Sequence, residues 1–460
     1  MRKLISVFAI ALLTVSAAFA QKVNQYGVAV QSDRLDVEAQ DGILVMSSPT
    51  SKYKLWFDIR VQADVAGFFG APSYADPIGN GVSIRRARFA AKGQVDENWY
   101  GEFDMDLANG LVELKDAIVR YTGVPNLEIQ AGNFKENFSI QRNTTSRYLQ
   151  FMERPMVCSA LAPSRHFGFN VKYAKDWFWG SVGIFGPEIA GSEEWTNIAD
   201  NNKDYGRGWS LLGKTGFSVT NKLVFRPLYK LDNASLHIGL AHSFRTTQVS
   251  QATGEWGTYR ASARNSTSIN RKKYLDTNNL KGYDYNHLWT VEIAGHWNGL
   301  RYEAAYIGDN VHFKDEADPA SISVKNFGGW YVQAGYLLFG GKQRYDSNGG
   351  KYTKIAPGKK WGDVELCGRY EYCNLNCGDV YGGCAEAYTL GLNYWVTNNV
   401  KMQLNYQFNN NDRYANGKDK LNVGLDADGN PTKDYTKVVT ASGKAGVDYH
   451  MISLRFEIDF

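Results

Sequence analysis

Residues 451–460 read MISLRFEIDF, and this stretch decides the fold class. One set of positions is apolar and the alternate set is largely polar: Ile452, Leu454, Phe456, Ile458 and Phe460 against Met451, Ser453, Arg455, Glu457 and Asp459. A period of two places these sets on opposite faces of a β-strand. Residues 400–409 and 55–65 repeat the alternation, and no helical pattern in the sequence is as strong. The sequence therefore predicts an all-β protein.

A soluble β-sandwich and a transmembrane β-barrel share this alternation, but four features favour the barrel. The strands are about ten residues long, the length that a tilted strand needs to cross a bilayer. The 28 Tyr, 23 Phe and 12 Trp gather near strand ends, as in aromatic girdles. Short turns such as 396–399 alternate with long polar connections such as 410–445. The chain ends on an outward aromatic residue, Phe460, which resembles the terminal strand of bacterial outer-membrane proteins. A closed barrel also leaves no strand edge unpaired in lipid.

The first twenty residues have the pattern of an export signal. Two basic residues precede an apolar run over 4–15, and Ala18-Phe19-Ala20 forms an A-x-A cleavage site. A membrane anchor is the alternative, although the run is short and ends in small residues. We predict a signal peptide at 1–20, an N-terminal periplasmic segment at 21–52 and a transmembrane barrel at 53–460.

Composition excludes several classes of protein. Of the 460 residues, 43% are hydrophobic, which is too many for a disordered chain. The only unbroken apolar run lies at the start, which excludes a polytopic helical membrane protein. The formal net charge is +4, and removal of residues 1–20 leaves 49 basic and 47 acidic side chains. So small an excess does not indicate a nucleic-acid partner.

Sixteen alternating segments follow one another between Tyr53 and Phe460. The segments that run from the periplasmic side to the outer side lie near 53–66, 98–106, 126–134, 177–185, 234–244, 300–308, 363–373 and 400–409. The segments that run back to the periplasmic side lie near 84–95, 112–121, 166–173, 209–225, 287–296, 327–339, 384–395 and 446–460. An even number places both chain ends on the periplasmic side. We predict a 16-stranded antiparallel transmembrane β-barrel with inward-folded loops, which is wide enough for an aqueous lumen.

Five cysteines in an exported chain raise the question of disulfides. Cys158 stands alone, whereas Cys367, Cys373, Cys377 and Cys384 lie within eighteen residues. Four thiols allow three pairings, and the sequence does not choose among them. Unpaired thiols and a zinc site are the alternatives, although the cluster holds no His and the compartment is oxidising. We expect the four clustered cysteines to form a disulfide clip in a loop.

Positive charge gathers in three long connections. Loop 135–165 has a net charge of +3, loop 245–286 of +4, and insert 340–362 of +5, whereas 186–208 and 309–326 are acidic. The insert lies on the side where turns should be short, and a long connection commonly has a function or is disordered. We expect the insert and loop 135–165 to fold into the lumen, where low-dielectric walls focus the field of Lys and Arg on anions. Any single Arg could instead be solvated or paired with a carboxylate.

Two neighbouring motifs resemble a known family. GNFKENFS at 132–139, followed by SRYLQFMERP at 146–155, resembles the third-loop region of the phosphate-selective porin O and P family. VELKDAIVRYTGVPNLEIQAG at 112–132, WGDVELCGRYEY at 361–372 and YTLGLNYWVTNNVKMQLNY at 388–406 are similar too, so the resemblance covers most of the chain after residue 20. It implies a sixteen-stranded barrel, usually trimeric, whose inward-folded loops form an anion-selective constriction lined by Arg and Lys.

The resemblance also points to individual residues. Lys135 matches the lysine of GxFKE, Arg154 matches the arginine of FMER, and Arg85 with Arg86 matches a paired-arginine strand, whereas Asn137 stands where a Pro is common. Lys135 could instead pair with Glu136 or Glu153 and only fix the loop. Together with the charge pattern, the expected anion-binding pore lining is Lys135, Arg142, Arg147, Arg154, Arg60, Arg85, Arg86, Arg88, Arg120, Lys354, Lys359, Lys360 and Arg369.

No enzyme and no cofactor are expected. The sequence contains no GxSxG, HExxH or Walker A run. His242-Ser243 is better explained as a lumen or loop pair than as a hydrolase site, and the seven His are scattered without metal-ligand spacing. Asp104 and Asp106 share one strand face, as counter-charges in the pore or as partners of a lumen Arg.

These features predict a passive outer-membrane porin of a Gram-negative bacterium that conducts anions such as phosphate or polyphosphate. Outer-membrane lipid surrounds it, a homotrimer is expected, and no nucleic acid takes part. The alternative is a surface interaction or adhesion barrel, or a weakly selective general porin, whose long loops carry the function. The sequence leaves the preferred anion open.

Overall fold

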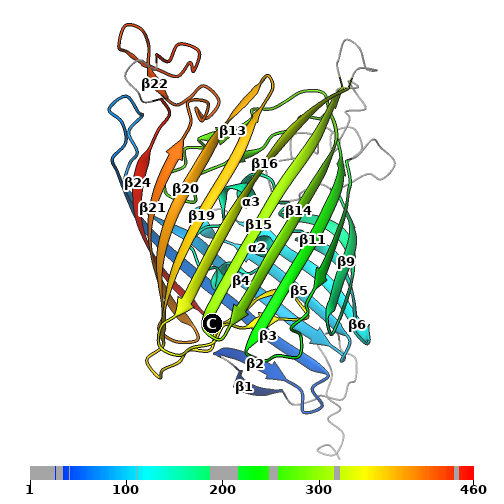
Figure 1. Ribbon diagram of the computed structural model, residues 1–460. Coiled ribbons are helices and arrows are strands. Elements are labelled where there is room, and N and C mark those ends of the chain that lie inside the picture. Colours follow the sequence, from blue (N-terminus) through cyan, green and yellow to red (C-terminus); the bar gives the residue numbers. More distant parts are fainter. Residues whose placement is uncertain are drawn as a thin grey trace, which may run out of the picture.

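Sixteen antiparallel strands close into one barrel in the computed structural model (Figure 1). The structure describes residues 26, 35–40, 42–110, 112–186, 216–247, 257–314, 322–439 and 445–460. The predicted signal peptide and the acidic segment 187–208 lie outside these residues. The barrel strands are β3 (Tyr53–Phe69), β4 (Gly81–Val95), β5 (Trp99–Asp106), β6 (Glu113–Val124), β7 (Leu127–Lys135), β8 (Arg165–Lys175), β9 (Phe178–Phe185), β10 (Ser218–Phe225), β11 (Ala234–Thr246), β14 (Tyr283–Trp297), β15 (Leu300–Lys314), β16 (Ile322–Leu337), β19 (Asp363–Cys377), β20 (Val380–Trp395), β21 (Val400–Asn411) and β24 (Tyr449–Asp459).

Each barrel strand pairs with its neighbour in the chain, and the last strand returns to the first. In β24, Leu454 lies opposite Val65 of β3, and Phe460 exchanges two backbone hydrogen bonds with Ile59 (2.7 and 3.0 Å). This pairing removes both sheet edges, as lipid requires. The predicted sixteen-stranded antiparallel barrel is confirmed.

The two faces of each strand follow the alternation in the sequence. On β24, Ile452 and Phe456 are exposed on the outside, whereas Met451 and Arg455 are buried inside. Outward aromatic rings form two belts near the strand ends. The pairs of neighbouring rings are Trp289–Tyr306, Trp330–Tyr370 and Tyr370–Tyr388 near the outer ends, and Trp177–Phe225, Phe339–Trp361 and Trp361–Tyr394 near the periplasmic ends.

Several strands are longer at their outer ends than the sequence indicated. Strands β14, β15, β16, β19 and β20 have 15 or 16 residues each. Residues 374–383, which we expected to form a loop, belong mostly to the β19–β20 hairpin, because β19 continues to Cys377 and β20 begins at Val380. The polar residues here still pair as strands beyond the membrane.

The expected disulfide clip is wrong, because all five cysteines are free. Cys373 lies opposite Ala385, and Cys384 lies opposite Asn374, so these two thiols project to opposite faces of the β19–β20 hairpin. Cys377 lies opposite Val380, and Cys367 lies opposite Gly391. Neighbouring strands therefore offer no cysteine a cysteine partner.

We expect all five thiols to react when the protein is denatured without reductant. The reason is the strand register, which keeps Cys373 and Cys384 on opposite faces of one hairpin. A thiol count against a calibrated chromogenic reagent checks this, with the same sample after reduction as its control. A lower count before reduction would contradict it.

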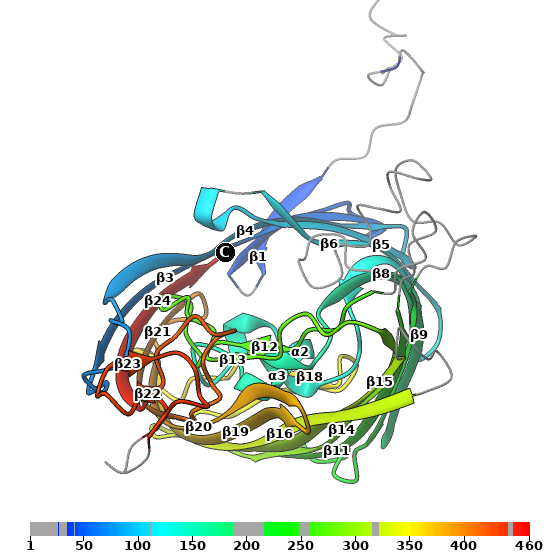
Figure 2. The same ribbon diagram turned by 90° about the horizontal axis from the view of Figure 1, so that it is seen from above.

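Shorter elements lie inside and around the barrel. Figure 2, a view from above, shows α2, α3, β12, β13 and β18 within the ring of strands. The inner elements are α2 (Ile140–Asn143), η2 (Ser146–Tyr148), α3 (Met156–Ala160), β12 (Ser262–Ala263), β13 (Leu275–Asp276), β17 (Tyr345–Asp346) and β18 (Lys351–Tyr352). The others are η1 (Ala108–Gly110), the pair β22 (Gly424–Leu425) and β23 (Pro431–Thr432), and the hairpin of β1 (Asp36–Gln40) and β2 (Ile43–Ser47), which pairs with the periplasmic end of β3. The inward-folded connections predicted from charge and length are thus present.

The apolar core lies inside the barrel, under one of these connections. Residues 136–164, which we call the inner loop, carry Phe138, Met156 and Cys158, all without solvent exposure. They pack against Leu288 and Tyr331 of the barrel wall and against the buried residues of connection 257–282. The inner loop therefore fills one side of the lumen and leaves the other side open. Among the described residues, no helix has the length and apolar character that crossing a membrane requires.

Candidate functional site

Wall carboxylates hold the inner loop on strands β14–β19. Each accepts a hydrogen bond from a backbone or amide N–H of the loop, and such bonds to a charged acceptor are the stronger ones. The pairs are Ile140 N to Glu292 (2.8 Å), Gln141 to Glu303 (2.7 Å), Gln150 to Glu365 (2.8 Å) and Met156 N to Glu371 (2.5 Å). These four carboxylates are therefore covered by the loop.

Basic side chains of the barrel wall also donate hydrogen bonds to the inner loop, from β15, β19 and β24. Arg301 donates to Tyr148 O at 2.9 Å, and Arg455 donates to Met152 O at 2.5 Å. Arg369 donates to the carbonyl of Glu153 at 2.8 Å. Arg369, which we expected in the pore lining, therefore lies beneath the loop.

The two acidic residues of the inner loop are both paired with wall residues. Glu136 meets Arg245 at 2.9 Å and His166 at 2.7 Å. Glu153 accepts two hydrogen bonds from Arg85, at 2.5 and 3.0 Å.

Glu153 is further surrounded by cations, with Arg455 at 3.0 Å and Arg86 at 3.9 Å. Burial alone would raise the pKa of Glu153, but Arg85, Arg86 and Arg455 hold that pKa well below its ordinary value. The pair Arg85–Glu153 also shows that Arg85 is an anchor of the loop, and Arg85 does not line the cavity described next.

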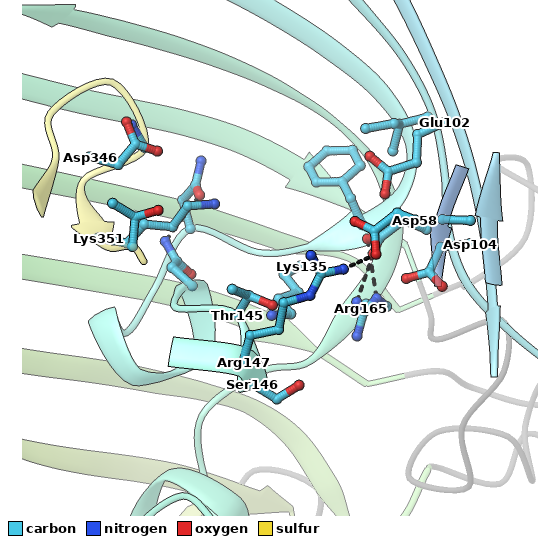
Figure 3. Close-up of a pocket in the computed structure, with 18 of the residues that line it drawn as sticks. Asp58, Glu102, Asp104, Lys135, Thr145, Ser146, Arg147, Arg165, Asp346 and Lys351 are labelled. Carbon is cyan, nitrogen blue, oxygen red and sulfur yellow. Dashed lines mark hydrogen bonds and ion pairs between the residues drawn. The ribbon is translucent and has the colours of Figure 1, made fainter. Parts of the chain in front are cut away.

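A cavity of about 480 Å³ lies between the inner loop, the periplasmic insert (residues 340–362) and strands β3–β9. Figure 3 shows Lys351 and Asp346 of the insert on one side, Asp58, Glu102 and Asp104 of the barrel wall on the other, and Lys135 and Arg147 between them. The eleven basic residues around it are Arg60, Arg86, Arg88, Lys92, Arg120, Lys135, Arg147, Arg154, Arg165, Lys172 and Lys351. The six acidic residues are Asp58, Glu102, Asp104, Asp116, Glu128 and Asp346. Basic side chains thus exceed acidic ones at this place.

Most carboxylates of the cavity are counter-charges to specific cations. The pairs are Asp58–Lys92 (2.8 Å), Glu102–Lys92 (3.5 Å), Asp104–Arg88 (3.5 Å), Asp116–Arg165 (2.7 Å) and Glu128–Lys172 (2.7 Å). Carboxylate oxygens of Glu102, Asp104 and Asp116 lie within 4.8 Å of one another, but each group already has a cation beside it. Asp104 is therefore both a pore residue and a partner of Arg88, whereas Asp106 pairs with Arg88 (3.2 Å) and does not line the cavity.

Lys135 has no such partner. Among the residues that the structure describes, no carboxylate forms an ion pair with its ammonium group, because Glu136 and Glu153 are taken by wall arginines and Asp116 by Arg165. Lys351, on the insert, likewise forms no ion pair with a described carboxylate. The alternative in which Lys135 pairs with Glu136 or Glu153 does not match this geometry.

Seven of the thirteen expected pore residues line the cavity. They are Arg60, Arg86, Arg88, Arg120, Lys135, Arg147 and Arg154. Two of these also brace the inner loop, since Arg60 donates to Ser146 at 2.8 Å and Arg154 donates to Gln141 O at 2.6 Å.

Six expected pore residues lie elsewhere. They are Arg85, Arg142, Lys354, Lys359, Lys360 and Arg369. Lys359 and Lys360 are exposed at the turn before β19, and the Arg142 Nε is buried without a hydrogen-bond partner among the described residues.

Our expected lining omitted four cations that do line the cavity: Lys92, Arg165, Lys172 and Lys351. Lys172 follows His166 and Asn170 on the buried face of β8, so the alternation alone could have identified it. For Lys351, the sequence shows only a basic insert and not which of its lysines points inward.

Residues 57–430 match a family described as Phosphate-selective porin O and P. The chain belongs to this family. The resemblance noted in its third-loop motifs is therefore confirmed. Members of the family are porins, so this protein is an outer-membrane porin of Gram-negative type, and family and fold are those of channels.

Individual relatives are distant. A protein of Caulobacter vibrioides, described as uncharacterized, is 26% identical over 361 residues, which are 75% of this porin and 66% of that protein, just under two thirds. Porin O of Pseudomonas aeruginosa is 21% identical over 431 residues, which are 87% of this chain and 93% of Porin O. The outer membrane channel DcaP of Acinetobacter baumannii superposes with a TM-score of 0.50 at 10% identity, over 90% of this chain and 99% of DcaP. That likeness supports the barrel fold.

Proposed function

We propose that this porin is a passive, anion-selective diffusion channel for phosphate-type anions. The observation that carries the proposal is the cavity beside the inner loop, where basic residues outnumber acidic ones and Lys135 has no described carboxylate partner. Low-dielectric walls strengthen the field of such a cluster. The family description, phosphate-selective porin, supports the class of anion.

Most other cations of the cavity form ion pairs with carboxylates, and this arrangement favours the passage of anions over their tight binding. A phosphate group entering the cavity loses part of its hydration, and charge-assisted hydrogen bonds from Arg and Lys replace it. Arg88 already forms an ion pair with Asp104, and Arg165 forms one with Asp116. Each of these arginines therefore binds a passing anion less tightly than an unpaired cation would. Several moderate sites allow release as well as entry, which conduction requires.

Reversal potential under a salt gradient tests the proposal. The purified protein is inserted in a planar bilayer, with chloride, phosphate and pyrophosphate compared in single-channel recordings. We expect a reversal potential of the sign that anion permeation gives. A potential near zero, or one of the opposite sign, would favour the alternative of a weakly selective porin or a surface interaction barrel.

Within the periplasmic insert, we expect Lys351 to matter more than its exposed neighbours. Lys351→Gln should lower anion conductance by roughly twofold or more, because it removes a cation from the cavity wall. The matched control is the double variant Lys359→Gln, Lys360→Gln, which removes two exposed charges outside the cavity. Equal conductance losses in both variants would show that the insert acts through its total charge.

We also propose a homotrimer in outer-membrane lipid. The family resemblance supports this, and so do four small outward residues on the neighbouring strands β3, β4 and β5, which allow close contact between chains: Ala63, Ala87, Ala91 and Gly101. Mass measurement of the detergent-solubilised protein, before and after heating, tests the assembly. A single-chain mass before heating would exclude it.

A further inference from the structure

Three histidines lie together on the outside of the barrel, far from the cavity. His242 of β11, His287 of β14 and His312 of β15 alternate with buried residues and face outward near the outer ends of adjacent strands. Strand pairing brings His242 Nε2 within 3.0 Å of His287 Nδ1. The ring centroids of His287 and His312 are 6.1 Å apart. Their wide separation in the sequence hides this arrangement.

Aromatic rings fix the cluster at the rim of the membrane. Tyr285 stacks on His312 with a centroid distance of 4.2 Å, and the ring of Phe244 lies 5.3 Å from that of His287. Trp289, the next outward residue after His287 on β14, belongs to the outer aromatic belt. Such belts mark the membrane–water interface, so His287 lies on its aqueous side.

We propose that His242 and His287 form a site for a divalent transition-metal ion, with copper as the best fit. Imidazole nitrogen is a favoured ligand of copper, nickel and zinc. Metal–nitrogen bonds of about 2.0–2.1 Å to two nitrogens at the observed separation give an angle of about 95° at the metal. That angle suits neighbouring positions of a square-planar or octahedral ion, whereas tetrahedral zinc prefers a wider one.

The hydrogen bond between the two rings does not prevent binding. In the metal-free pair, one ring donates its N–H to the other nitrogen. A neutral imidazole can carry its proton on either nitrogen, so the donor ring shifts its proton to the far nitrogen and both facing lone pairs become free. No net proton is released, and water completes the coordination. His312 stands beside His287 as a further imidazole.

This site is independent of the proposed channel function. The histidines face outward, whereas the cavity lies inside and is lined by none of them. Metal binding and anion conductance are therefore separable, and the failure of one proposal leaves the other standing.

Copper binding to the purified full-length porin in detergent tests the proposal. We expect one Cu²⁺ per chain in equilibrium dialysis and an electron paramagnetic resonance spectrum with nitrogen ligation. His242→Ala and His287→Ala should each weaken binding at least about tenfold. His287→Gln keeps a hydrogen-bonding side chain and should weaken it as much. The control is His450→Ala, an outward histidine that instead contacts Tyr406 (2.9 Å).

The copper-binding results of the variants decide whether His242 and His287 are the ligands. Anion conductance equal to wild type shows that a variant is folded. Nitrogen-ligated copper that survives in His242→Ala and His287→Ala overturns the proposal, and so does a signal lost only in His450→Ala. Absence of bound copper in the wild-type protein overturns it too. Mg²⁺, which prefers oxygen ligands, should not compete.

Discussion

Replacing Lys135 by Glu should lower the ratio of anion to cation permeability at least about tenfold. The substitution exchanges an unpaired cation of the cavity wall for an anion among eleven basic and six acidic residues. Because the side chain faces the lumen, the change avoids the penalty for a charge on the lipid face. Reversal potential and single-channel conductance in phosphate measure the effect. A difference in gel migration between unheated and heated samples shows that the variant is folded.

Two further variants are controls for the effect of Lys135→Glu. Lys135→Arg keeps the charge and should keep most of the selectivity. Lys360→Glu makes the same charge change at an exposed position outside the cavity and should have little effect. If Lys135→Glu conducted anions like the wild type, the selectivity filter would have to lie elsewhere in the lumen.

Removing the carboxylate of Glu153 should release the inner loop. Glu153→Gln leaves Arg85 and Arg455 without their shared counter-charge, and breaking a buried pair in this way costs about 3–5 kcal/mol. We expect larger and noisier single-channel currents, because the loop no longer narrows one side of the lumen. Glu113→Gln is the matched control, since Glu113 is exposed and its pair with Lys115 is worth about 0–1 kcal/mol. Quiet currents of wild-type size from Glu153→Gln would show that the wall hydrogen bonds suffice.

The same anchor has a defined pH dependence. A carboxylate whose pKa is lowered in the folded protein stabilises it fully above the ordinary carboxyl pKa, and this contribution is lost as the pH falls through the lowered value. The pKa of Glu153 lies well below its ordinary range. Acidification to about pH 5 should therefore leave the loop in place, and current noise should rise only in stronger acid.

The sequence predicted the barrel because every spanning strand needs one face for lipid and one for the lumen. That requirement produces the alternation of Ile452 and Phe456 with buried Arg455, and it holds only within the membrane. Beyond it, polar residues such as those in 374–377 still pair as strands, but no lipid constrains their outer face. The outer strand ends and the placement of the cysteines were missed for this reason.

The sequence predicted a lumen site lined by basic residues, but it did not predict which of these residues form ion pairs. The family motifs pointed to Lys135 and Arg154, and both side chains line the cavity. Which cations stay unpaired depends on partners far away in the chain, and Arg85, a neighbour of Arg86, turns out to bind Glu153, 68 residues away. The histidine cluster escaped notice for the same reason, since His242 and His287 meet only through strand pairing.

The position of Glu153 links the inner loop to the assembly of the barrel. Its partners come from β4, near the start of the wall, and from β24, its last strand, where Arg455 also binds Asp64 of β3. Arg455 lies 302 residues after Glu153 and reaches it only when the final strand has joined the first. During biogenesis, a chain in which β24 has not yet paired with β3 would lack the contact between Arg455 and Glu153 that helps to anchor the inner loop. The constriction of the lumen is therefore completed last. A correctly constricted pore is then evidence that the cylinder has been completed.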